Sequence, residues 1–516
     1  MITNLKTLAN SRDVPYHSLF KFFSLSFWRR NVKYAHRTAS VANRARLRES
    51  YITMCDFLRL LVAIPFLGFV VSAEGARLSI QAGNSLLVGE RPGITVDGVD
   101  PGERVRLHSF RSQMVSVREA GAYVNKNVIF HAWADFAGNS KGTVDVDAQP
   151  PVAGSYSGAD PRGFFWSGYA EGSGPTPPTP GGVPAAETLK GRVVRFELER
   201  KGAIADARSL ALRLWNDDIE FTKVETPNVV GYFAAPKGAL KLPVAITLHG
   251  SEGGTFDAAK RDAGLFASHG FATLSLIYFA WPYSGIVQVP QAFDNIPLER
   301  IAYARKWLAG RPEADVTRLA LRGVSKGSEL ALLAAAEYQW VRAVAACVPS
   351  SLVWGAFGAD FSDGKPHSGF SFAGKPLANI GYGDYAPVEA GTMTLAARHR
   401  LDRTAASGDA VRSAAISVER SSARFLLAGS GEDDVWPSLE MSKEVAARLQ
   451  AAGKEPLIEL QLFPHAGHYI CGTGDAPSRS GSSDGSTPGG GAAEATGQAA
   501  GEVWEKTLAF LRGSLR

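Results

Sequence analysis

The sequence is poor in cysteine and has no Cys/His spacing typical of a zinc site. Its 516 residues include three cysteines, Cys55, Cys347 and Cys471. Three cysteines cannot build the disulfide framework that stabilises small secreted domains. We therefore expect no structural metal and no cofactor. Hydrophobic residues make up 45% of the chain, which is enough for sizeable cores, and the length favours two folded units with unstructured ends.

The sequence also lacks a uniform excess of positive charge. Residues 1–53 contain ten Lys/Arg against two acidic residues, a charge of +8, which leaves −3 for the other 463 residues of a chain whose net charge is +5. A surface made for nucleic acid would be basic throughout the folded part. We therefore predict that nucleic acid is not a partner.

Long apolar runs are rare, and residues 54–73 form the clearest one. This stretch begins with Met54, is interrupted by Pro65 and ends in small residues at Ala73, as a signal peptide with a cleavage site does. We predict a basic leader with a signal peptide over 1–76 and hence an exported, periplasmic or secreted protein, with Met54 as the true initiator. The alternatives are an uncleaved membrane anchor, although the run is short for a span, and a buried helix.

Helix signals are absent from residues 77–170. Short alternating apolar runs separated by Pro/Gly turns fill this part, which predicts antiparallel strands packed as a small, immunoglobulin-like β-sandwich. Residues 171–185 are rich in Pro and Gly and predict an extended linker.

From residue 186 to residue 470, apolar runs alternate with helical periods. Continuous apolar runs are typical of strands that are buried on both faces, so this part predicts a mostly parallel, doubly wound α/β sheet. The runs that we assign to strands are 244–250, 271–279, 318–323, 341–348, 423–430 and 458–463. Pro297 precedes a helical period that extends to residue 310.

Three segments depart from this alternation. Residues 356–420 have a mixed Gly/Ser/Asp composition and predict an insertion over the sheet, in the position of a lid. Residues 471–502 are rich in Gly, Ser and Ala and are predicted to be disordered, because they have too few large apolar groups to offset the entropy of ordering. Residues 503–516 predict a closing helix of the α/β domain.

The sharpest chemical motif is Gly-Val-Ser-Lys-Gly at 323–327. It follows an apolar strand and precedes a helical period, which is the context of a nucleophile elbow in the α/β-hydrolase fold. Glycines two residues before and after the serine allow the close backbone packing of such a turn. We therefore predict Ser325 as the nucleophile, against the alternative of a structural turn.

A serine hydroxyl needs a base, and the α/β-hydrolase fold places the triad in the chain order Ser, acid, His. His468 and His465 both follow the last predicted strand; we choose His468, because Gly467 favours a tight turn that aims the second ring toward Ser325. The preceding strand ends in Glu432, Asp433 and Asp434. We choose Asp434 as the acid that orients the imidazole, with Asp433 as the alternative.

Acyl transfer also needs backbone donors for the developing oxyanion. The N–H of Lys326 at the helix start is one candidate. The other is expected in the glycine-rich loop 249–254 after the strand at 244–250, at Ser251 or a neighbour. A plain turn is the alternative interpretation of this glycine cluster.

Together with the segment 131–168, and above all its stretch GSYSGADPRGFFWS, these motifs resemble the acyl-CoA thioester hydrolase / bile acid-CoA:amino acid N-acyltransferase family. The resemblance covers roughly residues 80–470 and the closing helix. It implies a β-sandwich joined to an α/β-hydrolase domain, a role in fatty acid and lipid metabolism, and a triad at Ser325, Asp434 and His468. The quoted stretch has no catalytic candidate, and we expect it to fix the sandwich against the hydrolase domain.

The resemblance implies an acyl-CoA or another acyl thioester as substrate. Family members that transfer the acyl group to amino acids use a cysteine nucleophile, whereas this chain has Ser325. An acyl-serine ester is lost to water more readily than an acyl-cysteine, so we predict hydrolysis through an acyl-enzyme. The alternatives are an exported carboxylesterase or peptidase of the same fold, an N-acyltransferase, and a binding protein with a vestigial site.

Export conflicts with a coenzyme A substrate, because acyl-CoA is a cytoplasmic metabolite. The natural substrate would then be another ester or thioester. Arg398, His399 and Arg400 in the predicted lid could meet the phosphates of coenzyme A, but a solvated basic surface is the favoured interpretation.

Overall fold

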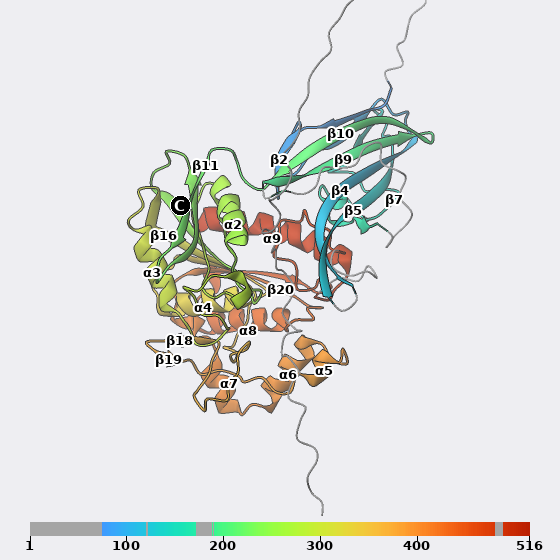
Figure 1. Ribbon diagram of the computed structural model, residues 1–516. Helices are drawn as coiled ribbons and strands as arrows, with labels where there is room; N and C mark the ends of the chain where they lie inside the picture. The colour runs from blue at the N-terminus through green and yellow to red at the C-terminus, as the bar shows by residue number, and fades with distance from the viewer. Residues whose placement is uncertain (1–74, 120–121, 172–187, 189, 480–488) are drawn as a thin grey trace, which may run out of the picture. The chain divides into compact units, whose positions relative to one another are not determined.

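The computed structural model describes residues 75–119, 122–171, 188, 190–479 and 489–516 (Figure 1). The predicted signal peptide at 54–73 lies outside this range, and so do all but the last two residues of the predicted leader (1–76) and nearly all of the predicted linker. None of the helices described is both long and apolar enough to cross a membrane.

The N-terminal part is a β-sandwich of two sheets. A small sheet has the order β1-β3-β6, and a larger one the order β2-β10-β9-β4-β5-β7, with β8 beside β5. Alternate residues of the strands point inward, as in β3, whose Ile94 and Val96 are buried while Asp97 is exposed. The strands are β1 Arg77–Ile80, β2 Ser85–Leu87, β3 Ile94–Asp97, β4 Arg104–Glu119, β5 Ala122–Ala137, β6 Thr143–Asp145, β7 Ala153–Gly154, β8 Tyr169–Ala170, β9 Gly191–Arg200 and β10 Ala203–Arg213.

The boundary between the two domains differs from the prediction. Strands β9 and β10 follow the linker, yet β9 pairs antiparallel with β4, so the sandwich extends to Arg213 and the boundary predicted at residue 186 is wrong. The linker composition marks a long connection within the sandwich rather than its end. A short helix, α1 (Gly163–Trp166), also lies in a part of the chain that has no helix signal in its sequence.

The second part is an α/β-hydrolase domain, as predicted. Its eight-stranded sheet has the order β11-β12-β14-β13-β16-β17-β20-β21, and every pair from β14 to β21 is parallel. All six predicted strands are present. The strands are β11 Ile219–Glu225, β12 Val230–Pro236, β13 Leu242–Leu248, β14 Ala272–Leu276, β16 Ala314–Val324, β17 Ala343–Cys347, β20 Arg424–Ser430 and β21 Ile458–Phe463.

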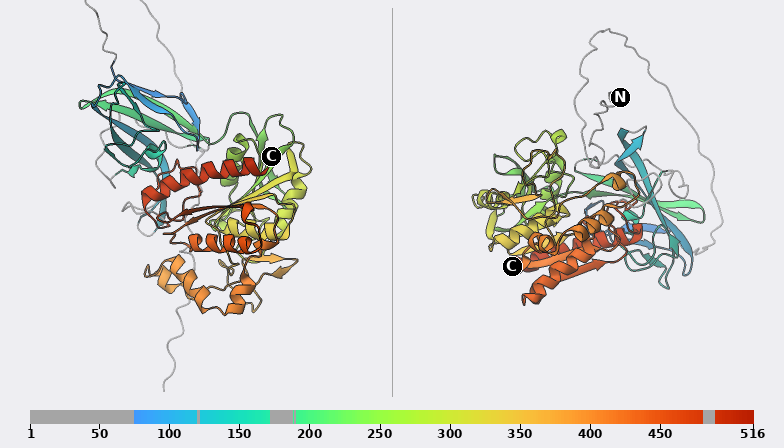
Figure 2. Two further views of the ribbon diagram at one scale, coloured as in Figure 1. Left: turned by 180° about the vertical axis from the view of Figure 1, so that it is seen from behind. Right: turned by 90° about the horizontal axis from the view of Figure 1, so that it is seen from below.

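Helices cover both faces of this sheet (Figures 1 and 2). One face packs on α3 (Glu299–Leu308), α4 (Lys326–Glu337) and α8 (Ser438–Ala451), and the other on α2 (Phe256–Ser268) and α9 (Ala493–Ser514). All five residues of β17 are buried, which explains why its sequence is a continuous apolar run.

Residues 356–420 form an insertion between β17 and β20, as predicted. It contains the short strands β18 (Phe370–Phe372) and β19 (Lys375–Pro376) and the helices α5 (Ala386–Glu389), α6 (Leu395–Ala405) and α7 (Gly408–Ala414). Strand β18 pairs with β15 (Ile296–Pro297), just before α3, so the insertion is attached to the body of the domain.

The prediction of disorder over residues 471–502 is wrong for the parts that the structure describes. Asp475 is fully buried, and its carboxylate accepts a hydrogen bond of 2.5 Å from the N–H of Gly89 in the sandwich. The last helix, α9, begins at Ala493, ten residues before the predicted start. Small residues are needed in this helix, because a Cβ on Gly497 would lie 2.5 Å from the ring of Trp166.

The stretch GSYSGADPRGFFWS joins the sandwich to α9, as predicted. The guanidinium of Arg162 donates to Glu505 at 2.8 Å and to the carbonyl of Gly89 at 2.6 Å. The hydroxyl of Ser157 donates to Glu494, also on α9, at 2.6 Å. The side chains of this motif therefore hold the sandwich against α9, and none of them is a catalytic candidate.

Candidate active site

Ser325 stands on a sharp turn between β16 and α4. Its backbone has φ 53° and ψ −119°, a conformation that costs a non-glycine residue free energy and that is typical of a nucleophile elbow. A Cβ on Gly323 would lie 2.3 Å from the carbonyl oxygen of Gly327, and a Cβ on Gly327 would lie 2.4 Å from the carbonyl oxygen of Leu248. Both glycines of the motif are thus required by close backbone contacts.

His468 lies in the loop after β21, at the same carboxyl edge of the sheet as Ser325. Its Nδ1 is 2.9 Å from Oδ2 and 3.0 Å from Oδ1 of Asp433, and both side chains are almost fully buried. The Nδ1–H group therefore donates to the carboxylate and leaves Nε2 as the nitrogen that can accept a proton. His465, by contrast, is exposed and pairs with Glu432 at 3.0 Å.

The acid beside the imidazole is Asp433, so the choice of Asp434 is wrong. Besides His468, the Asp433 carboxylate accepts hydrogen bonds from the N–H groups of Val435 and Trp436 and, at 2.6 Å, from the hydroxyl of Ser438. These donors hold Asp433 inward and compensate for its burial. Asp434 is exposed, and partial desolvation raises its pKa, with a further contribution from the neighbouring negative charges of Asp433 and Glu432.

The glycine-rich segment after His468 packs against the triad loop. The carbonyl oxygen of Gly489 accepts hydrogen bonds from the N–H groups of His468, at 2.9 Å, and Asp434, at 3.1 Å. A Cβ on Gly467 would lie 1.8 Å from the carbonyl oxygen of Gly490. Gly467 has no positive φ, so this close approach, rather than the predicted tight turn, is what requires glycine before the histidine.

The loop after β13 lies beside the nucleophile. A Cβ on Gly250 would be 3.4 Å from the Cβ of Ser325. Among the described residues, no backbone hydrogen bond uses the N–H of Ser251 or of Lys326. The role of these two groups as oxyanion donors stays a prediction, whereas the N–H of Gly250 donates to Glu252 Oε1 at 2.9 Å.

A buried ion pair directly follows the nucleophile and was not predicted. The ammonium of Lys326 donates to Glu329 at 2.9 Å, and the other carboxylate oxygen of Glu329 accepts from the N–H of Trp354. The rings of Phe293, Phe357, Tyr382 and Trp436 surround the ammonium at 5.1 to 5.9 Å. The i,i+3 spacing of Lys326 and Glu329 is the signal in the sequence that could have revealed this pair.

Trp436 connects this pair to the triad. Its ring lies 5.3 Å from the Lys326 ammonium and meets the His468 ring edge-on at 6.3 Å, while its indole N–H donates to the carbonyl of Val348. The N–H of Trp436 also bonds to Asp433. The fully buried side chain of Trp436 thus packs against both the Lys326–Glu329 ion pair and the ring of His468.

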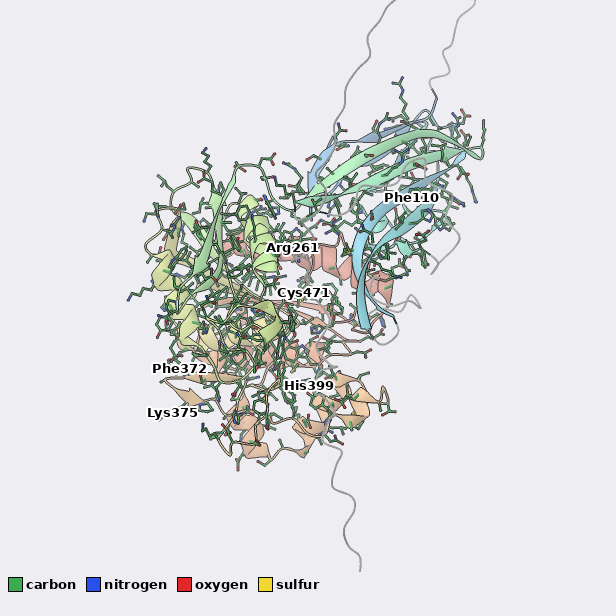
Figure 3. The ribbon with its side chains drawn as sticks, in the orientation of Figure 1. Phe110, Arg261, Phe372, Lys375, His399 and Cys471 are labelled. Atoms are coloured by element: carbon green, nitrogen blue, oxygen red, sulfur yellow. A yellow bond between two sulfur atoms is a disulfide. The ribbon has the colours of Figure 1, made fainter. Side chains whose placement is uncertain are left out.

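The basic group of the insertion is paired within the protein. Arg398 bonds to Asp402, and Arg400 to Glu440 at 3.0 Å. His399 on α6 (Figure 3) is buried edge-on against Trp354 at 4.5 Å, and this burial lowers its pKa to about 4. The three residues do not form one solvated basic surface, because His399 is part of the core.

A disulfide joins Cys347 to Cys471, a pairing that the cysteine count did not predict. Cys347 ends β17, and its carbonyl oxygen accepts hydrogen bonds from the N–H of Ser325 at 3.0 Å and the hydroxyl of Ser328 at 2.8 Å. Cys471, marked in Figure 3, follows His468 by three positions. The bond therefore ties the histidine loop to the strand beside the nucleophile elbow.

The fold and the elbow define an enzyme of the α/β-hydrolase class. Residues 90–225 match the family described as "Acyl-CoA thioester hydrolase/BAAT N-terminal region", and residues 296–516 match "BAAT / Acyl-CoA thioester hydrolase C terminal". The chain therefore belongs to the acyl-CoA thioester hydrolase/BAAT family and is an acyl-CoA thioester hydrolase-like enzyme. The family resemblance seen in the sequence is confirmed.

Two relatives similar in sequence agree with this membership. Mitochondrial acyl-coenzyme A thioesterase 2 of Rattus norvegicus is 26% identical over 400 residues, which cover 77% of this chain and 79% of the relative. Acyl-coenzyme A thioesterase 1 of Homo sapiens is 25% identical over 389 residues, 73% of this chain and 81% of the relative. The solved structure of a putative dienelactone hydrolase from Klebsiella pneumoniae is 16% identical, covers 57% of this chain and 98% of its own, and has a TM-score of 0.35.

Proposed function

We propose that this enzyme hydrolyses acyl thioesters through a triad of Ser325, His468 and Asp433 and a covalent acyl-enzyme. The observation that carries the proposal is the buried hydrogen bond between Nδ1 of His468 and Asp433, at the sheet edge where Ser325 stands on a nucleophile elbow. Nε2 of the imidazole is then free to take the serine proton.

In the proposed reaction, the Ser325 oxygen attacks the thioester carbonyl while His468 accepts its proton. The N–H groups of Ser251 and Lys326 stabilise the oxyanion, and the thiolate leaves with the proton from the imidazole. Water activated by His468 then attacks the acyl-serine ester and releases the carboxylic acid. The serine nucleophile favours hydrolysis over transfer to an amino acid.

The test is turnover of palmitoyl-CoA by the Ser325→Ala variant. We expect its kcat to fall by at least about 10³-fold, because removal of a nucleophile leaves only binding and oxyanion stabilisation. Ser362→Ala, in an exposed turn of the insertion, is the matched control and should keep wild-type activity. Undiminished turnover by folded Ser325→Ala would refute the assignment.

We also propose that the mature chain is exported after cleavage at Ala73. Cleavage there would remove Cys55 and leave Cys347 and Cys471, which are bonded to each other. A disulfide with no spare cysteine suits an oxidising compartment. N-terminal sequencing of the mature protein tests this proposal, and a start before residue 74 would contradict it. Export would favour a thioester other than acyl-CoA as the natural substrate.

A further inference from the structure

A carboxylate that the proposed reaction does not use lies beside the nucleophile. A Cβ on Gly250 would lie 3.4 Å from the Cβ of Ser325 and 2.6 Å from Oε2 of Glu252. The other oxygen of Glu252, Oε1, is held by the N–H of Gly250 at 2.9 Å. Glu252 is therefore fixed with one oxygen bonded and the other directed to the nucleophile side of the loop.

Two tyrosines lie within electrostatic range of Glu252. Desolvation is the main cause of the raised pKa of Tyr283 and of Tyr469, and the negative charge of Glu252 adds to it in both. These two tyrosines are 48% and 46% exposed. A carboxylate with exposed aromatic rings in its electrostatic range is a combination that can bind ammonium groups.

The charge of Glu252 has no close cationic partner among the described residues. No ion pair within 4.0 Å includes Glu252, and Asp262 adds a second negative charge nearby. Arg322 is the basic residue that interacts with both carboxylates, more strongly with Asp262, but its guanidinium donates to the carbonyl of Cys471 at 2.6 Å. Although Glu252 keeps solvent-exposed surface, the surrounding atoms desolvate its carboxylate and raise its pKa. A bound cation would relieve this cost.

We infer that Glu252 is a specificity residue that binds a positively charged amine of the substrate next to the scissile carbonyl. The inference rests on the proposed function. The preferred substrates are then acyl thioesters that have an ammonium group either on the acyl chain, as in a β-aminoacyl thioester, or on the leaving thiol. Both sources offer the same chemistry to the carboxylate.

Two isosteric substrate pairs separate these sources. On the acyl side, β-alanyl-N-acetylcysteamine is compared with butyryl-N-acetylcysteamine, in which a methyl group replaces the ammonium. On the thiol side, butyrylthiocholine is compared with S-(3,3-dimethylbutyl) thiobutyrate. We expect the wild-type enzyme to prefer the cationic member of at least one pair by roughly tenfold in kcat/KM, as for a charge-assisted contact in a partly desolvated site.

Glu252→Gln keeps an acceptor for the N–H of Gly250 and removes the charge. It should reduce the preference to about one while the neutral substrates are still hydrolysed. Glu432→Gln is the matched control, because Glu432 is an exposed acid that pairs with His465 on the same edge, and it should retain the preference. Wild-type hydrolysis of the neutral thioesters without a preference in either pair would overturn the inference and leave the proposed function intact, as would an unchanged preference in Glu252→Gln. Failure to hydrolyse any thioester would overturn both.

Discussion

Replacement of Asp433 and Asp434 by asparagine tests the orientation of the imidazole. In Asp433→Asn the side chain keeps its shape, and its oxygen can still accept from the N–H groups of Val435 and Trp436. The amide NH₂ then takes the place of Oδ2 and faces Nδ1 of His468, 2.9 Å away in the wild type. Because an NH₂ group donates, Nδ1 has to accept, and the proton moves to Nε2, where it blocks attack by Ser325.

The loss in kcat should be roughly 10³- to 10⁴-fold, or about 4 to 5.5 kcal/mol of transition-state stabilisation, which is the usual effect of a wrong tautomer in such a triad. Asp434→Asn changes an exposed group and should stay within about threefold of the wild type. Steady-state kinetics with palmitoyl-CoA, together with circular dichroism to verify folding, measure both variants. A larger loss in Asp434→Asn than in Asp433→Asn would refute the argument.

Three further predictions concern the surroundings of the triad. Gly467→Ala should lower kcat at least about tenfold, because its Cβ would lie 1.8 Å from the carbonyl oxygen of Gly490. A Cβ on Gly472 would meet nothing within 4 Å, so Gly472→Ala should keep the wild-type kcat. The same kcat in both variants would contradict this prediction. Cys471→Ser should lower the free energy of unfolding by about 3 to 5 kcal/mol in denaturant titrations, because the disulfide spans 124 residues. Reduction of the wild-type protein should have the same effect. Unchanged stability after reduction would contradict this prediction. Burial lowers the pKa of His399 from 6.5 to about 4, so the unfolded chain binds a proton at this residue before the folded chain does. The free energy of unfolding should therefore fall by up to about 3 kcal/mol as the pH decreases from 6.5 to 4. His399→Phe should remove this part of the pH dependence, and an identical pH dependence in the variant would count against the argument.

The parts of the fold that the sequence predicted are those that local patterns determine. The strands of the hydrolase sheet are continuous apolar runs because both of their faces are covered, and the elbow has its glycines because the backbones around Ser325 nearly touch. The sandwich boundary was misplaced because the pairing of β9 with β4 joins segments separated by a long linker, and no local signal records such a pairing.

Other features depend on contacts that composition does not reveal. Asp433 and Asp434 are chemically equivalent in the sequence, and the N–H groups of the following turn decide which of them points inward. The glycine-rich tail has the composition of a disordered segment, but glycine is required at position 490, where φ is +83° and a Cβ would lie 2.3 Å from the carbonyl oxygen of Glu432. The disulfide joins residues on different strands and loops, so the number of cysteines alone does not indicate it.

The most direct test of the triad is labelling by a fluorophosphonate, which forms an irreversible bond with an activated serine. After digestion of the labelled protein, mass spectrometry should find the phosphonate on the peptide that contains Ser325. The His468→Ala variant, whose serine has no base, should react at least about 10³-fold more slowly. A folded wild-type protein that does not react at Ser325, or a His468→Ala variant that reacts as fast as the wild type, would contradict the proposed mechanism.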